Sequence, residues 1–183
     1  MSVQPHPEAA GSGVPGKGIV TIRHQLPQDL EWIETLHALA FGPGRYARAA
    51  FRVRERFPLD PDLSLVAELD ERPVSSVWMT PISLSGIDGY LLGPLATDPA
   101  FRGRGAARML VREVTRRALA RGEGHFVLLV GDYPYYGPLG FERTSPGAIV
   151  FPGPVDPERV LAHTPDAGLA SQLKGQVAAF GAR

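Results

Sequence analysis

A short segment in the middle of the chain, Leu95 to Arg108, joins an apolar strand to an arginine-rich helix through a turn with two glycines. It reads L-A-T-D-P-A-F-R-G-R-G-A-A-R. A strand that enters such a turn and continues as a helix directs backbone N–H groups and the positive end of a helix dipole toward one point. That arrangement suits a pyrophosphate. The segment therefore predicts an α/β fold around this helix and a site for a phosphorylated cofactor.

Length and composition narrow the class of protein. A chain of 183 residues can bury one core without disulfides or structural metal. Its 19 basic and 19 acidic residues balance, which argues against nucleic acid as a partner. The absence of cysteine excludes a thiol nucleophile and cysteine-ligated metal. The histidines are scattered, without the spacing of a metal site, so we expect no metal.

The beginning of the chain differs from the rest. Residues 1–17 have almost no large apolar side chains and predict a disordered tail, and residues 18–183 are expected to form a single domain. The sequence has neither the pattern of a signal peptide nor an apolar run of membrane-spanning length. We therefore expect a soluble, cytoplasmic protein that does not bind membranes.

Apolar periodicity predicts alternating strands and helices. Strands are expected at 18–26, 63–69, 74–79, 90–97, 125–130, 148–151 and 159–163, and helices at 27–40, 45–56, 105–121 and, as a short turn, 133–139. The runs at 63–69 and 74–79 predict a hairpin, whereas the strands on either side of helix 105–121 should be parallel. The fold class is thus α/β with a mixed sheet. The pattern of the last twenty residues predicts neither a helix nor a strand.

Gly93 and Pro94 lie inside the strand that precedes the glycine turn. Proline donates no hydrogen bond to a neighbouring strand, and glycine tolerates a bulge. We therefore expect strand pairing to be interrupted there. A ligand with amide groups could pair with the freed edge, as peptides do when they add to a sheet.

Three phosphate-binding motifs can be compared with the turn. A Walker loop would need Gly-Lys-Ser or Gly-Lys-Thr, and a dinucleotide fingerprint would need glycine where Arg108 stands. The pattern R-x-x-G-x-A does fit, at Arg102, Gly105 and Ala107. A second pattern, Y-x-x-x-G-F, occurs at Tyr136, Gly140 and Phe141.

With these two motifs in this order, the region from Gly18 to Phe151 resembles the GNAT superfamily of acyl-coenzyme A-dependent N-acetyltransferases. Paired tyrosines before the Gly-Phe step make it similar to a bacterial subgroup. The resemblance implies the GNAT fold: a central, mostly antiparallel sheet with one splayed parallel strand pair, flanked by helices. It departs from the family where an asparagine is usual, because the short loop after strand 125–130 offers Asp132 instead.

The resemblance also implies where acetyl-coenzyme A would bind as cosubstrate. The strand whose backbone holds the pantetheine corresponds to Leu95, Ala96 and Thr97. The pyrophosphate turn corresponds to Arg102, Gly103, Arg104, Gly105, Ala106, Ala107 and Arg108.

The tyrosine that the family places near the thioester sulfur corresponds to Tyr136. A phenol with a pKa near 10 can protonate a departing thiolate at neutral pH. With no cysteine and no G-x-S-x-G elbow, we expect direct attack by an amine with both substrates bound. Glu68, His125 and Asp132 are candidates to accept the amine proton, although Asp132 also fits a helix N-cap.

The leading interpretation is transfer of an acetyl group to a primary amine, on a small molecule or a protein. The alternative is a non-catalytic module that binds or senses acyl-coenzyme A. The apolar residues of the segment 152–183 could pack on the sheet or on a second subunit, so a homodimer is possible.

Overall fold

The computed structural model describes residues 18–122, 125–166 and 168–182, and the tail expected at 1–17 lies outside them. No helix within these ranges is long and apolar enough to cross a membrane. The helices and strands follow in the order β1 (Val20–His24), α1 (Leu30–Phe41), α2 (Ala49–Arg54), β2 (Leu65–Leu69), β3 (Arg72–Leu84), β4 (Ile87–Thr97), α3 (Ala106–Leu119), β5 (Phe126–Val130), α4 (Tyr133–Tyr136), β6 (Glu142–Arg143), β7 (Ile149–Val150), β8 (Val160–His163) and β9 (Gly175–Ala179).

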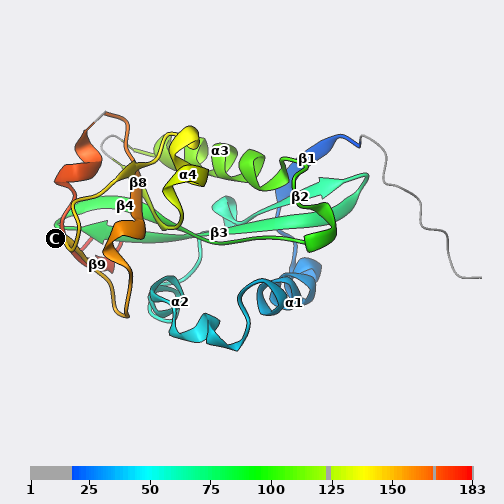
Figure 1. Cartoon of the computed structure of the whole chain (residues 1–183), viewed down its shortest axis with the longest axis horizontal. Helices are drawn as coiled ribbons and strands as arrows, with labels where there is room; N and C mark the ends of the chain where they lie inside the picture. The colour runs from blue at the N-terminus through cyan, green and yellow to red at the C-terminus, as the bar shows by residue number, and fades with distance from the viewer. Residues whose placement is uncertain (1–17, 123–124, 167, 183) are drawn as a thin grey trace, which may run out of the picture.

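The strands form a mixed sheet in the order β1-β2-β3-β4-β5-β8-β6, and β9 pairs with both β3 and β7. Neighbours are antiparallel except for β4 with β5 and the short pair β7 with β9. Helices α3 and α4 lie on one face of the sheet, and α1 and α2 lie on the other (Figure 1). The mixed sheet and the parallel pair around α3 confirm the fold class expected from the sequence.

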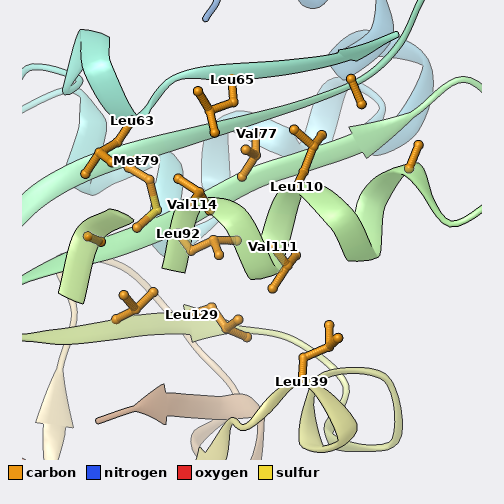
Figure 2. Packing of buried hydrophobic residues seen from close by; sticks show 14 of the residues in the cluster. Leu63, Leu65, Val77, Met79, Leu92, Leu110, Val111, Val114, Leu129 and Leu139 are labelled. Atoms are coloured by element: carbon orange, nitrogen blue, oxygen red, sulfur yellow. The ribbon is translucent and has the colours of Figure 1, made fainter. Parts of the chain in front are cut away.

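Helix α3 packs on the sheet through one apolar face. Leu110, Val111, Val114 and Ala118 are fully buried, and they recur at the spacing of a helix. They belong to a cluster with residues of β2 to β5 (Figure 2). This packing fixes the start of α3, and therefore the glycine turn, against the end of β4.

Replacing Leu110 with alanine should lower the free energy of unfolding by about 2–5 kcal/mol, because the side chain is fully buried and its removal leaves a cavity. Urea unfolding would measure the change. The neighbouring Met109 is 41% exposed, so Met109→Ala should change stability by less than about 0.5 kcal/mol. Equal effects of the two variants would contradict the described packing of α3.

Helices α1 and α2 cover the opposite face of the sheet, each through a few apolar side chains. Ile33 of α1 packs against Val66 and Trp78, whereas α2 joins a second cluster through Ala49 and Val53. The prediction of one continuous helix at 45–56 is wrong. A 3₁₀ turn occupies Pro43–Ala47, and the residue before α2 is extended, which leaves only a short helix against the sheet.

Two strands differ from the sequence prediction. β3 continues past Met79 through Pro81 to Leu84. Pro81 lies between the part of β3 that pairs with β2 and the part that pairs with β9, an interval where a missing N–H is tolerated. β9 lies in the C-terminal region that gave no clear prediction, and it joins the sheet beside β3.

Candidate active site

β4 and β5 lie side by side over only part of their length. Their pairing runs from Gly89 opposite Phe126 to Leu91 opposite Leu128, although β4 continues to Thr97 and β5 to Val130. Beyond Leu91, the edge of β4 that faces β5 is no longer paired with that strand. The two strands therefore open a gap at their carboxyl ends.

A bulge in β4 coincides with this opening. Leu92 pairs with Met79 and Leu95 with Val77, so Gly93 and Pro94 together stand opposite a single residue of β3. The two residues are joined by a cis peptide bond, and Gly93 has a φ of +134°. The interruption expected at Gly93-Pro94 is thus confirmed.

A cavity of about 260 Å³ lies at the opening. It is bounded by the splayed ends of β4 and β5, by α1 and α2 on one face of the sheet, and by residues that follow β5. Its lining comprises Glu34, His37, Phe41, Arg45, Arg48, Ala49, Ala50, Phe51, Arg54, Trp78, Leu92, Gly93, Pro94, Leu95, Leu129, Val130, Tyr136, Pro154, Val155, Asp156 and Arg159.

The end of β4 connects this cavity to the glycine turn. Leu95 lines the cavity, and the next two residues are held by Ser75 of β3. The Ser75 hydroxyl donates to the Ala96 carbonyl at 2.8 Å and lies 2.8 Å from the Thr97 hydroxyl. Leu95, Ala96 and Thr97 therefore form a fixed strand between the cavity and the turn.

The turn itself leaves space at the start of α3. Gly103 and Gly105 have φ values of +78° and +86°, and a Cβ on either would meet no atom within 4 Å. Gly105 is the N-cap of α3 and has no side chain to cap it, although the first N–H groups of a helix lack partners inside it. Arg102 and Arg108, three residues before and after Gly105, are both exposed. The turn can therefore receive an anion.

The second motif brings Tyr136 to the cavity. α4 ends at Tyr136, Gly140 turns the chain with a φ of +91°, and Phe141 is buried beneath the tyrosine with ring centroids 5.7 Å apart. Burial raises the pKa of Tyr136, so its phenol stays protonated at neutral pH. Tyr135 links α4 to the turn, because the Arg108 guanidinium lies 5.7 Å from its ring. The spacing of Tyr136, Gly140 and Phe141 in the second motif thus allows the chain to turn at Gly140 and the two rings to pack together.

Comparison with known proteins agrees with this geometry. The sequence model of the acetyltransferase (GNAT) family matches residues 30–141, which include the splayed strands, the glycine turn and Tyr136. The chain belongs to the GNAT acetyltransferase family. The uncharacterized N-acetyltransferase YhbS of Escherichia coli K12 is 35% identical to it over 127 residues, 68% of this chain and 74% of YhbS.

Solved structures of GNAT proteins have the same fold. The structure of Escherichia coli YhbS in complex with CoA superposes with a TM-score of 0.68 and 26% identity, over 94% of this chain and 92% of that one. An acetyltransferase from Brucella melitensis, in complex with acetyl-CoA, gives 0.59 and 26% over 88% and 96% of the two chains. The ligand of the second structure, acetyl-CoA, is the cosubstrate that the sequence predicts for this chain.

Glu68, one candidate base, lies in an ion-pair network near the start of α1. Its carboxylate accepts from Arg23 at 2.7 Å, and Arg23 also pairs with Asp29 at 2.6 Å. This contact lowers the pKa of Asp29. Glu68 does not line the cavity. In this GNAT domain its carboxylate therefore anchors β1 and β2 to the start of α1.

The other candidate bases also lie off the cavity lining. Asp132 stands at the N-cap of α4, as the sequence suggested, but its carboxylate makes no capping bond and instead pairs with Arg159 at 3.2 Å. His125 precedes β5, at the end away from the splay, and packs between Tyr90 and Phe180. Of Tyr136, Glu68 and Asp132, which the sequence predicts to be catalytic, the structure brings only Tyr136 to the cavity.

Sequence reasoning missed the wall formed by α1 and α2. Arg45, Arg48 and Arg54 line the cavity, as do Glu34 and His37. The strongly basic character of 45–56 was the available signal. Burial, together with the charges of Arg54 and Arg45, lowers the pKa of His37 to about 4, so its ring is neutral at pH 7. Among the residues that the structure describes, no three His, Asp or Glu side chains come together as a metal site.

Proposed function

We propose that this protein is an acetyl-CoA-dependent N-acetyltransferase that transfers an acetyl group to a primary amine, with both substrates bound together. The observation that carries the proposal is the opening between β4 and β5, which leads from the glycine turn to a cavity that contains Tyr136. The CoA and acetyl-CoA complexes of the two GNAT relatives support the choice of cosubstrate.

In this proposal the cosubstrate is held at two places. The pyrophosphate binds to the N–H groups at the start of α3, with help from Arg102, Arg104 and Arg108, because these groups and the helix dipole favour an anion. The pantetheine amides pair with the freed edge of β4 at Leu95 to Thr97, as a further strand would. A Cβ at Gly103 or Gly105 would meet open space, which is consistent with a ligand beside the turn.

Acetyl-CoA supplies an acetyl thioester. The neutral amine nitrogen forms a bond to the acetyl carbonyl carbon, and the carbon–sulfur bond breaks. Tyr136 gives its proton to the departing sulfur and regains a proton from water after the transfer, since burial favours the protonated phenol.

The amine must lose a proton during the transfer. The carboxylates of Glu34 and Asp156 line the cavity, whereas those of Glu68 and Asp132 do not. We therefore propose that water near Glu34 or Asp156 carries this proton away. Glu68 and Asp132 have a structural role, because their carboxylates form ion pairs with Arg23 and Arg159.

Thiol release tests the proposal. Purified protein mixed with acetyl-CoA and a panel of primary amines should release CoA with at least one amine, and mass spectrometry should show the acetylated product. Protein mixed with acetyl-CoA alone should carry no acetyl group. A stable acyl-enzyme would contradict direct attack. Binding of acetyl-CoA without CoA release from any amine would instead favour the non-catalytic module.

A further inference from the structure

We propose that the acceptor amine also carries an anionic oxygen group, a carboxylate or a phosphate, and that Arg54 binds this group. The inference rests on the proposed function and specifies its acceptor. Four arginines line the cavity, at positions 45, 48, 54 and 159, against the carboxylates of Glu34 and Asp156 in the lining and of Asp132, which pairs with Arg159 from outside it. A bare amine, which is cationic in solution, would enter a site with excess positive charge.

Arg54 lies against aromatic rings in the cavity wall. It extends from α2 onto the cavity wall, where its guanidinium lies 4.7 Å from the ring of Phe51 and 5.1 Å from that of Trp78. Its Nε is buried and has no hydrogen-bond partner within the described ranges. None of the ion pairs found in those ranges includes Arg54.

A guanidinium nitrogen that is buried without a hydrogen-bond partner, as the Nε of Arg54 is, is costly unless a ligand supplies the partner. Burial lowers the pKa of Arg54 to about 10, while the charge of Glu34 raises it, so the group remains cationic at pH 7. A planar guanidinium held between aromatic rings matches the two oxygens of a carboxylate or phosphate. A ligand anion would supply the partner that the protein does not.

Arg45 and Arg48 add positive charge to the same wall of the cavity. Arg45 bonds the Gly42 carbonyl at 3.2 Å and the Tyr46 hydroxyl at 2.6 Å, yet its Nε is buried without a partner in the described chain. Arg48 lies over the ring of Phe41 at 5.1 Å. Aromatic rings and backbone, in place of carboxylates, thus hold these cations.

The position of Arg54 also sets how an acceptor lies. α2 covers one face of the sheet, and α4, which carries Tyr136, lies on the other (Figure 1). The cavity extends between them through the gap at β4 and β5, and side chains of Phe51, Trp78 and Val155 give it apolar walls. The acceptor therefore places its amine toward Tyr136 and its anion toward α2, with an apolar body between.

An equilibrium measurement tests this without requiring turnover. N-acetyl-phenylalanine, N-acetyl-leucine and N-acetyl-methionine, each paired with its carboxamide, would be titrated calorimetrically into the CoA-saturated protein. N-acetyl-phosphoethanolamine serves as the phosphate arm. We expect at least one anion to bind about tenfold or more tightly than its neutral counterpart, since charge-assisted hydrogen bonds are the stronger kind. Preference for the carboxylate or the phosphate arm identifies the group.

Arg54→Gln should remove this preference and leave the affinity for CoA unchanged. Arg52→Gln is the matched control, because Arg52 lies on the same helix but pairs outward with Glu55 at 3.1 Å. Equal binding of acids and amides by the wild type, no binding of any anion at millimolar concentration, or a preference that survives Arg54→Gln would overturn the inference. Failure of CoA release in the amine panel would instead count against the proposed function.

Discussion

Replacing Tyr136 with phenylalanine is expected to lower kcat by roughly ten- to a thousand-fold, measured as CoA release with the best amine of the panel. The variant keeps the ring, which packs on Phe141 with centroids 5.7 Å apart, and removes only the hydroxyl. Because the hydroxyl is proposed to act on the departing sulfur and not in holding the cosubstrate, the Kd for acetyl-CoA should change little.

Tyr133→Phe provides the control for this experiment. Tyr133 lies on the same short helix but is 41% exposed, and Arg143 stacks on it at 4.7 Å, outside the cavity. Its loss of a hydroxyl should leave kcat unchanged. Should Tyr136→Phe turn over as fast as the wild type, Tyr136 has no part in proton transfer.

The pH dependence of kcat offers a second view of the same group. Burial raises the pKa of Tyr136, so the protonated phenol, which is the active form, persists as the pH rises. Tyr136 should therefore cause no loss of kcat below about pH 10. A loss between neutral pH and pH 9 that disappears in Tyr136→Phe would contradict its proposed state.

Replacing Gly105 with tryptophan is expected to weaken acetyl-CoA binding by at least about a hundredfold, since two or more charge-assisted hydrogen bonds would be lost. The large side chain would fill the open space beside the start of α3 where the pyrophosphate is proposed to bind. Calorimetric titration of acetyl-CoA measures the effect.

Gly86→Trp separates this effect from backbone strain. Gly86 has a φ of +83°, close to the +86° of Gly105, and its Cβ would likewise meet no atom within 4 Å. It lies in the hairpin before β4, whereas the glycine turn follows the other end of that strand. Unchanged binding by Gly86→Trp, with binding lost in Gly105→Trp, assigns the effect to the turn. Equal losses would show that strain alone explains it.

The pattern of apolar residues within one segment is sufficient to predict a helix or strand that buries one face. The helix 105–121 was predicted because Leu110, Val111 and Val114 recur at helical spacing, and these residues are buried in α3. The Gly93-Pro94 step predicted the interrupted pairing because both residues limit hydrogen bonding within a strand. Both features depend on properties that a single segment carries by itself.

The acceptor side of the site could not be predicted in this way. Glu68 follows an apolar run, but only the fold shows that its carboxylate forms an ion pair with Arg23 of β1. Arg54 and Trp78 are distant in the sequence and meet because α2 packs on the face of the sheet that carries Trp78. Such pairings depend on tertiary structure, to which the periodicity of one segment gives no access.

Calorimetric titration of acetyl-CoA into the wild-type protein tests whether this chain binds the cosubstrate of the proposed reaction. We predict saturable binding at one site per chain, with free CoA as a competitor for the same site. Absence of binding at millimolar acetyl-CoA, by a protein shown to be folded, would contradict both the cosubstrate and the proposed acetyl transfer.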